Sequence, residues 1–221
     1  MILAATGLRS EARIVARPGV RVIACGGHGD VLERALVAAI SEQRPRALLS
    51  VGIAGALDPG LRVGDVVVDG DEAWCLSLSA GGRPTPGPAS PSLAPPRRGG
   101  VRGVDRPAAT IEEKATLHAT GAAAVDMETH IVARVAAAHS LPYAVFRIIS
   151  DTAAQTLPPA ARVPLNSDGS VNLPAVLLAL AKNPAQLPAL IRTARDADRA
   201  LKTLLRRLDD LGPLLGCPYL G

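Results

Sequence analysis

Apolar and polar positions along the chain form short apolar runs separated by amphipathic stretches, a pattern that predicts strands alternating with helices. The clearest run is Tyr143–Asp151, in which six of the first seven residues are apolar and the last two are Ser150 and Asp151. A short continuous apolar run bounded by polar residues is typical of a buried central strand. Further strands are expected at residues 1–5, 20–25, 46–52, 63–68 and 122–125, and Glu72–Leu76 is interpreted as a continuation of the strand at 63–68.

Helices are expected between these strands. Thr110-Ile111-Glu112-Glu113 has the spacing of a capping box and predicts a helix that begins there. Strand, turn and helix repeat along the chain, so we expect one α/β domain over residues 1–221, with three α/β/α layers and a central mixed, mainly parallel sheet. The predicted helices cover residues 8–15, 30–43, 110–120, 129–139, 173–181 and 184–208.

Two segments depart from the alternation of strands and helices. Residues 79–106 are rich in Gly and Pro, which predicts a long flexible loop near the mouth of a site. Residues 173–210 form a C-terminal helical extension in which leucines recur at helical spacing and arginines occupy the other faces. The sequence leaves two interpretations of this extension open: an amphipathic helix packed on the domain, or a basic amphipathic segment at a membrane surface.

Composition narrows the functional classes. The chain has 221 residues, a net charge of +4 and only one Trp, two Tyr and one Phe, too few aromatic residues for the stacking platforms of single-stranded nucleic-acid binding. The three cysteines are far apart and show no metal-ligand spacing, so we expect no metal site and a reducing, cytoplasmic setting. We find no secretory signal and no apolar stretch long enough to span a bilayer.

Three carboxylates stand at predicted junctions between strands and helices or loops: Glu11, Glu128 and Asp151. A doubly wound sheet can bring them to one edge, where ligands of such sheets bind. Together they suit cleavage of an N-glycosidic bond, because one carboxylic acid protonates the leaving base while another activates water or holds the sugar. The alternatives are structural: Glu11 offsets a helix dipole, and Asp151 caps a turn.

Three motifs in this order resemble one family. Residues 50–68 (SVGIAGALDPGLRVGDVVV), 124–129 (AVDMET) and 148–153 (IISDTA) are similar to signatures of the nucleoside phosphorylase and methylthioadenosine/S-adenosylhomocysteine nucleosidase superfamily. Residues 157–163 and 183–192 are similar to one branch, the hopanoid-associated phosphorylases, which act on adenosylhopane. The resemblance therefore implies a nucleoside phosphorylase-like fold and the release of a purine base.

The resemblance also implies roles for single residues. Asp151, with Ser150 beside it, would protonate or hydrogen-bond N7 of the departing adenine. Glu128 would hold the ribose hydroxyls, with Met127 packed against the sugar, and Glu11 would activate water. The sugar and nucleophile pocket would be lined by Gly52, Ile53, Ala54 and Gly55.

The chain departs from the family pattern in three places. Ile53 stands where the nucleosidases have Ser, and residues 49–51 lack the Arg with which phosphorylases hold phosphate. Gly7 and Arg9 are our candidate phosphate site, since a cation beside a helix N-terminus suits an anion. Residues 105–108 lack the aromatic residue expected to stack on the purine.

The function implied by the resemblance is release of adenine from adenosylhopane, giving ribosylhopane or its 1-phosphate. Inorganic phosphate is the candidate co-substrate, and no other cofactor is expected. The alternatives are a methylthioadenosine/S-adenosylhomocysteine nucleosidase and a non-catalytic nucleoside-binding relative. We expect a lipid-linked adenine nucleoside as partner, a homo-oligomer of two or more copies, no nucleic acid, and a cytoplasmic location that extends to peripheral contact with the inner membrane surface.

Overall fold

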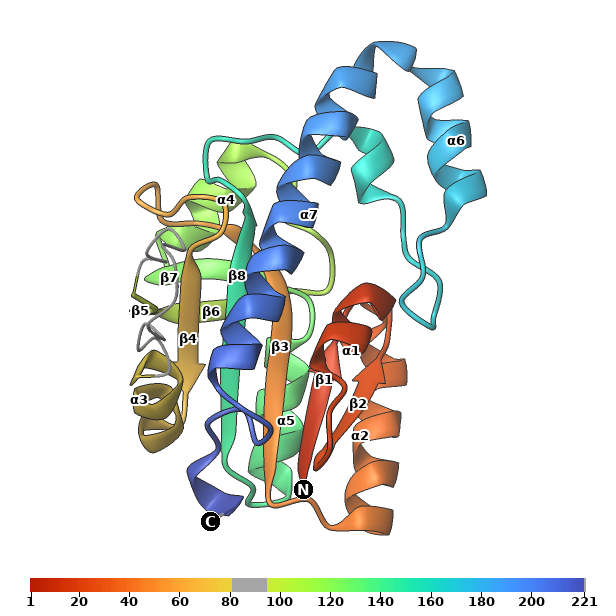
Figure 1. The fold of residues 1–221 in the computed structure, drawn as a ribbon. Coiled ribbons are helices and arrows are strands. Elements are labelled where there is room, and N and C mark those ends of the chain that lie inside the picture. Colours follow the sequence, from red (N-terminus) through yellow and green to blue (C-terminus); the bar gives the residue numbers. More distant parts are fainter. Residues whose placement is uncertain (81–94, 221) are drawn as a thin grey trace.

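A computed structural model describes residues 1–80 and 95–220 (Figure 1). One eight-stranded sheet runs through it in the order β2-β1-β3-β8-β4-β5, and β7 pairs with both β3 and β6. The pairs β3–β7 and β4–β8 are antiparallel and all other pairs are parallel, which confirms the predicted mixed, mainly parallel sheet. The strands are β1 (Ile2–Thr6), β2 (Val20–Ala24), β3 (Ala47–Ala56), β4 (Val66–Gly70), β5 (Arg97–Arg98), β6 (Gly100–Gly103), β7 (Ala122–Asp126) and β8 (Tyr143–Asp151).

Helices cover both faces of the sheet, as the three-layer prediction requires. Apolar side chains of α2 and α5 pack on one face, and those of α1, α3 and α7 pack on the other. The helices are α1 (Arg9–Val15), α2 (Gly29–Gln43), α3 (Glu72–Ala80), α4 (Ile111–His118), α5 (Thr129–Ala138), α6 (Leu173–Lys182) and α7 (Leu187–Asp210), with short 3-10 turns η1 (Pro159–Arg162), η2 (Pro184–Gln186) and η3 (Pro218–Leu220). None of the described helices is both long enough and apolar enough to cross a bilayer.

The predicted continuation of a strand at Glu72–Leu76 is wrong, because these residues begin α3. Asp71 accepts a hydrogen bond from the backbone of Trp74, which is how an N-cap starts a helix. Trp74 is fully buried and its indole donates to the carbonyl of Leu215. The sequence signal for a helix start was Asp71, three residues before Trp74. Burial of the Trp74 side chain then favours the helix over a strand.

The predicted loop at 79–106 is only partly a loop among the described residues. Its central part, residues 81–94, lies outside them. Arg97–Arg98 and Gly100–Gly103 form strands β5 and β6, so the sheet takes up the end of the segment. The backbone of Val101 donates to Asp69 Oδ2 at 2.8 Å, which ties β6 to the end of β4.

The predicted central strand is β8, which lies between β3 and β4. All of its residues from Ala144 to Asp151 are buried. Because β3 and β8 are parallel, their carboxyl ends reach the same edge of the sheet. Helix α4 packs on β7 near that edge, and its predicted capping box at Thr110 is present. These elements position the site.

Candidate active site

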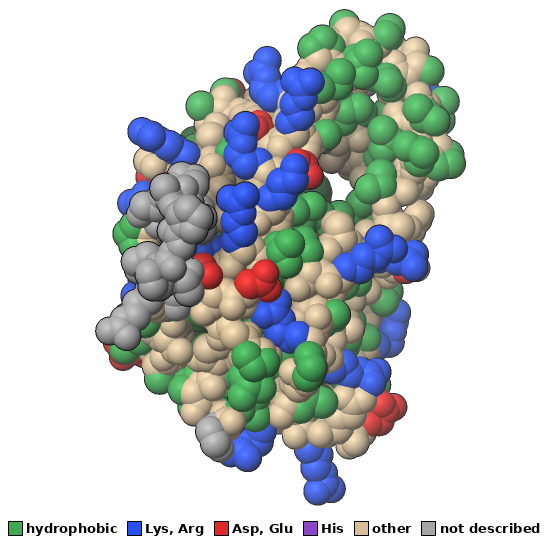
Figure 2. Space-filling model, in the orientation of Figure 1, with side chains coloured by type: hydrophobic (Ala, Val, Ile, Leu, Met, Phe, Trp, Pro, Cys, Tyr) green, Lys and Arg blue, Asp and Glu red, His purple; other side chains and the backbone are tan. Residues whose placement is uncertain are grey.

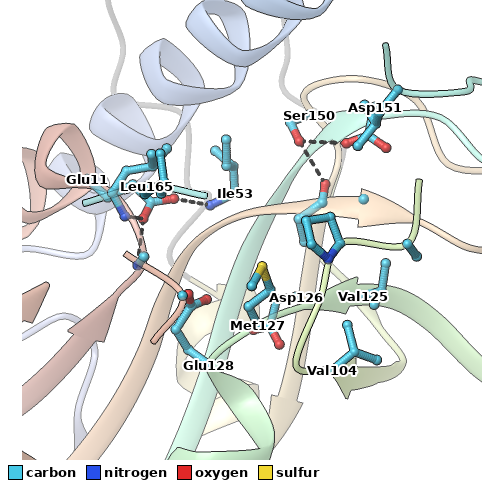
Figure 3. Close-up of a pocket in the computed structure, with 18 residues that line it drawn as sticks. Glu11, Ile53, Val104, Val125, Asp126, Met127, Glu128, Ser150, Asp151 and Leu165 are labelled. Atoms are coloured by element: carbon cyan, nitrogen blue, oxygen red, sulfur yellow. Dashed lines mark hydrogen bonds between the residues drawn. The ribbon is translucent and has the colours of Figure 1, made fainter. Parts of the chain in front are cut away.

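A cavity of about 220 Å³ opens at the carboxyl ends of β3 and β8 (Figure 3). Most of the residues expected at a site line it. They are joined by aliphatic side chains of β7 and of the loops that follow β6 and β8, and none of the lining residues in the described part of the chain is aromatic. The lining among the described residues is Gly7, Leu8, Glu11, Gly27, Ile53, Ala54, Gly55, Val104, Pro107, Ala108, Val125, Asp126, Met127, Glu128, Ser150, Asp151, Leu157 and Leu165.

Glu11 is held in the first turn of α1 by backbone amides. Its Oε2 accepts hydrogen bonds from the amides of Gly7 at 3.0 Å and Leu8 at 2.8 Å. Its Oε1 accepts from the amide of Ile53 at 2.7 Å. Burial raises the pKa of this carboxyl, although Arg147 and the three amides act in the opposite direction. Glu11 is therefore fixed in orientation and is a stronger base than an exposed glutamate.

Two glycines permit this arrangement by their lack of a side chain. A Cβ atom on Gly52 would lie 2.4 Å from Glu11 Oε1 and 2.7 Å from Arg147 Nη1. A Cβ atom on Gly7 would lie 2.6 Å from Glu128 Oε1. Gly52 does not line the cavity itself, so its contribution is the space that it leaves for Glu11 and Arg147.

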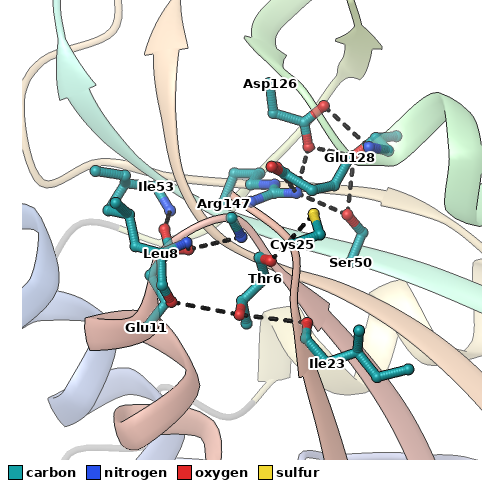
Figure 4. A network of polar contacts seen from close by, with 12 residues as sticks. Thr6, Leu8, Glu11, Ile23, Cys25, Ser50, Ile53, Asp126, Glu128 and Arg147 are labelled. Carbon is teal, nitrogen blue, oxygen red and sulfur yellow. Dashed lines mark hydrogen bonds and ion pairs between the residues drawn. The ribbon is translucent and has the colours of Figure 1, made fainter. Parts of the chain in front are cut away.

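Arg147 lies in the middle of β8 and is fully buried (Figure 4). Its Nη2 forms ion pairs with Asp126 and, at 3.2 Å, with Glu128, and it donates to Ser50 Oγ at 2.7 Å. Its Nε and Nη1 have no hydrogen-bond partner within the described part of the chain. A buried donor without a partner is costly, and Arg147 does not line the cavity, so these two nitrogens oppose part of the stabilisation that its ion pairs provide.

The polar cluster around Arg147 carries an excess of acid. Glu11, Asp126 and Glu128 surround this one guanidinium, and full ionisation would leave a net charge of −2. Burial raises the pKa of Glu128 to about 7; Arg147 opposes this effect, and the carboxylates of Asp126 and Glu11 add to it. The cluster therefore exchanges a proton near neutral pH, which suits acid–base chemistry.

Asp151 belongs to a second polar group. Its Oδ1 lies 2.9 Å from Ser150 Oγ, which also lies 3.2 Å from the carbonyl oxygen of Ala54. Its Oδ2 accepts a hydrogen bond of 2.5 Å from Lys114 Nζ, a side chain of α4 with no exposed surface. Lys114 also donates to the carbonyls of Thr152 at 2.7 Å and Gln155 at 2.9 Å. Lys114, which does not itself line the cavity, thus holds the Asp151 carboxylate at the cavity wall.

The two polar groups lie at separate parts of the cavity wall, with Glu11 at the left, Asp151 at the right and Met127 between them in the view of Figure 3. Aliphatic side chains fill the rest of the wall around Asp151. This arrangement can bind a planar base next to Asp151 and a polar sugar next to Glu128. It places Glu11 where it can activate a nucleophile.

Ile53 lines the cavity as predicted, whereas Arg9, the candidate phosphate ligand, lies outside the lining. Arg9 does not line the cavity; its guanidinium is largely exposed and binds Asp168 at 3.3 Å. Ile53 does line the cavity, and its backbone amide donates to Glu11. The main chain at this position therefore provides a polar group although the Ile side chain has none.

Sequence reasoning missed Arg147, Asp126 and Lys114. Arg147 interrupts an otherwise apolar strand, and a charge in a buried strand needs partners. That rule would have identified Arg147 as a site residue. Lys114 carried no such signal, because its helix is exposed on other faces and only the packing of α4 brings its side chain to Asp151.

Comparison with known proteins agrees with this fold. The futalosine hydrolase of Helicobacter pylori superposes with a TM-score of 0.57 at 17% identity, covering 95% of this chain and 96% of that one. An S-adenosylhomocysteine nucleosidase from Streptococcus pyogenes gives 0.59 at 16% identity, covering 94% and 95%. A 5′-methylthioadenosine/S-adenosylhomocysteine nucleosidase from Neisseria meningitidis gives 0.59 at 15%, covering 93% and 98%. A search of the curated proteins finds no match.

A family model described as the phosphorylase superfamily matches residues 12–96 and 93–182, most of the chain. The first of the two matched ranges begins one residue after Glu11. Together they contain the turn at Gly52–Gly55 and the residues around Glu128 and Asp151. The fold, the position of the cavity and this match agree. The chain belongs to the phosphorylase superfamily, a family of enzymes that cleave N-glycosidic bonds.

Proposed function

We propose that the protein hydrolyses the N-glycosidic bond of an adenine nucleoside whose C5′ carries a large apolar group, with adenosylhopane as the leading candidate. The observation that carries the proposal is the pair of polar groups on one cavity wall: Asp151 with Ser150 and Lys114, and Glu11 with Glu128 and Arg147. Cleavage of such a bond needs an acid at the leaving base and a base at the nucleophile.

Asp151 acts on the leaving group. Its carboxyl lies at the wall of a cavity that Val104, Pro107 and Ala108 also line, with aliphatic surfaces that suit the faces of a purine. In this scheme Asp151 is protonated when the nucleoside binds and gives its proton to N7 as the C1′–N9 bond breaks, so adenine departs as a neutral molecule. Lys114 is a positioning residue in this scheme, because its ammonium group holds Oδ2 and leaves the rest of the carboxyl for the base.

Glu11 acts on the nucleophile. Its raised pKa makes it a suitable base for a water molecule in the cavity, whose lining includes Glu11. Glu128 accepts hydrogen bonds from the ribose hydroxyls, and Met127 packs against the sugar. The oxocarbenium-like sugar then meets negative charge on the side of Glu11 and Glu128.

The charge of this cluster favours water over phosphate as the nucleophile. Phosphate is an anion, and next to Glu11 it would meet an excess of carboxylates whose shared cation, Arg147, already pairs with Asp126 and Glu128. Gly7 and Arg9 remain the candidate phosphate site for the competing phosphorolysis, but Arg9 is paired with Asp168 outside the cavity lining.

The 5′ group is proposed to be apolar because the cavity wall includes Leu8, Leu157 and Leu165. Leu157 and Leu165 belong to the connector between β8 and α6, and residues 157–163 of that connector, which include Leu157, resemble the adenosylhopane-specific branch. A methylthioadenosine/S-adenosylhomocysteine nucleosidase is the second candidate, supported by the fold shared with the nucleosidases of Streptococcus pyogenes and Neisseria meningitidis.

We further propose a cytoplasmic homo-oligomer of two or more copies, in peripheral contact with the inner membrane surface.

The test is an adenine-release assay on adenosylhopane and on methylthioadenosine, each with and without inorganic phosphate. The proposal expects turnover of adenosylhopane that does not depend on phosphate. Preference for methylthioadenosine would support the second candidate, and phosphate dependence would replace hydrolysis by phosphorolysis. Binding of either nucleoside without turnover would indicate a non-catalytic relative.

Asp151→Asn tests the mechanism. Its turnover should fall by about 10²–10⁴-fold while the thermal unfolding curve stays that of a folded protein, because the proton given to N7 is lost. Asp105→Asn is the matched control, since Asp105 is an exposed carboxylate whose partner is His130. Full activity of Asp151→Asn would contradict the assigned role.

A further inference from the structure

Helix α6 is apolar and has no buried residue. The side chains of Leu173, Leu177 and Leu178 are 58%, 56% and 58% exposed. Lys182, its last residue, carries the only charge of the helix. A helix with one face in water normally carries polar residues on that face. The exposed apolar face of α6 therefore indicates a contact with something other than water.

Helix α6 and the start of α7 form a hairpin that rises beyond the end of the sheet (Figure 1). The fully buried residues of α7 begin only at Ala200, and its first half is exposed or half-buried. Apolar side chains cover the hairpin in Figure 2, and Leu187 and Ile191 add to those of α6. We call residues 171–195 the hairpin.

The hairpin is held firmly, although it projects from the domain. Gln186, in the turn between its helices, is buried. Its Nε2 donates to the carbonyl of Ala179 at 2.8 Å, and its Oε1 accepts from the amide of Ala160 at 2.8 Å. These bonds join α6 to η1, against which it packs. The apolar face therefore has a fixed orientation relative to the cavity.

The charge of the hairpin indicates what covers this face. From Gly169 to Arg195 the sequence contains no acidic residue, whereas Lys182, Arg192 and Arg195 are exposed cations. A column of Lys and Arg side chains continues along α7 in Figure 2. An apolar face bordered by cations matches an anionic lipid surface, where leucines enter the acyl boundary and cations meet headgroups.

A second copy of the chain fits the hairpin less well. In a symmetric contact through the hairpin, each hairpin would pack against the hairpin of the other copy, and the exposed cations of both would come close together. We propose that the hairpin docks the enzyme on an anionic bilayer, with Leu173, Leu177 and Leu178 entering the membrane and Arg192 and Arg195 at the headgroups.

Docking would also orient the cavity. The connector that contributes Leu157 and Leu165 to the cavity wall runs directly into α6, and β1 rises from the N-terminus toward the same end of the molecule (Figure 1). The hairpin and the cavity are thus at one end, and a docked enzyme would present the cavity to substrates delivered from the bilayer. This consequence, unlike the docking itself, rests on the proposed function.

The test is flotation of the full-length protein with vesicles of phosphatidylcholine, alone and mixed with phosphatidylglycerol. We expect binding to the mixed vesicles that weakens with salt. Leu177→Gln/Leu178→Gln should bind at least about tenfold more weakly, because two leucines lose their transfer into the acyl region. Val37→Gln/Leu76→Gln is the matched control: both side chains are exposed apolar residues outside the hairpin, and this variant should bind as the unmodified protein does.

A charge-directed variant separates the two contributions. Arg192→Gln/Arg195→Gln should weaken binding to the mixed vesicles severalfold and reduce its salt dependence, with Arg21→Gln/Arg34→Gln as control. Thermal unfolding of all variants checks that they are folded.

Three outcomes would overturn the proposal. One is the absence of flotation with the mixed vesicles. Another is equal loss in hairpin variants and controls. The third is a change in oligomeric state that only Leu177→Gln/Leu178→Gln produces, measured by light scattering, since this would make the hairpin a contact between copies. Flotation measures binding and needs no turnover. If adenine is not released but vesicle binding is intact, the proposed function is refuted and the docking proposal stands.

Discussion

Glu128 offers the sharpest quantitative prediction, because its environment opposes its ionisation. It is 5% exposed and lies beside Asp126 and Glu11 with Arg147 as their common cation. Burial raises the pKa of its carboxyl from an ordinary value of 4.5 to about 7. We consider Glu128→Gln, a neutral replacement of nearly the same shape that resembles the protonated form.

The sign and size of the effect follow from proton binding. Between pH 4.5 and pH 7 the folded protein keeps a proton on Glu128 that the unfolded chain has lost, so the free energy of unfolding falls as the pH rises through this window. A tenfold change in proton affinity corresponds to about 1.4 kcal/mol, so this carboxyl accounts for a loss of about 3 kcal/mol. Below pH 4.5 and well above pH 7 its contribution is constant.

Glu128→Gln should therefore lose about 3 kcal/mol less stability than the unmodified protein between pH 4.5 and pH 7.5. Urea unfolding followed by circular dichroism at a series of pH values measures this difference. A falling slope should remain in the variant, because the pKa of the buried Glu11 is raised as well. At pH 7.5 the variant should be more stable and nearly inactive.

Glu33→Gln is the matched control, since Glu33 is an exposed carboxylate whose pKa is lowered by its hydrogen bond to Arg134. Its stability should depend on pH as in the unmodified protein. Identical pH profiles for Glu128→Gln and the unmodified protein would refute the reasoning, because they would mean that Glu128 is ionised in the folded state at no cost.

Three further predictions concern packing and reactivity. Lys114→Met should lower the free energy of unfolding by about 3–5 kcal/mol in urea titrations because it leaves Asp151 buried without its cation, while Lys202→Met, which breaks an exposed pair, should change it far less. Gly52→Ala should reduce turnover at least about tenfold in the adenine-release assay, since the new methyl group would displace a buried carboxylate and guanidinium. Burial raises the pKa of the Cys25 thiol to about 12, so iodoacetamide at pH 8 should modify it, by mass spectrometry, only after unfolding.

Much of the fold was determined by sequence alone. The apolar run of β8 predicted a central strand, because a strand covered on both faces carries apolar side chains on both of them, as Ala144, Val145, Phe146, Ile148 and Ile149 do. Thr110 and Glu113 marked the start of α4 through a local capping box, which depends on neighbouring residues only. Strand–helix alternation then implied the layered sheet.

The candidate site was predictable where a motif stood at a strand end and not elsewhere. Glu11, Glu128 and Asp151 all reach the cavity. The parallel strands β1 and β8 bring Glu11 and Asp151 to one edge, and β7, antiparallel to the end of β3, brings Glu128 there. Lys114 and Arg147 were not foreseen, because their roles depend on partners that lie 37 and 21 positions away along the chain. A charge gains its function from the groups around it.

The sequence by itself thus predicted most of the strands and helices and the carboxylates that follow them, which depend on local pattern, but it missed α3, β5 and β6. Tertiary structure decided which charges share a buried environment and therefore exchange protons near neutral pH, as Glu128 does beside Arg147. It also decided that α6 would project with its leucines exposed, whereas the leucines in the second half of α7 are partly buried on the sheet. The physical reason is the same in both cases: desolvation depends on what packs nearby, and hydrophobic periodicity cannot say whether an apolar face is covered by its own chain.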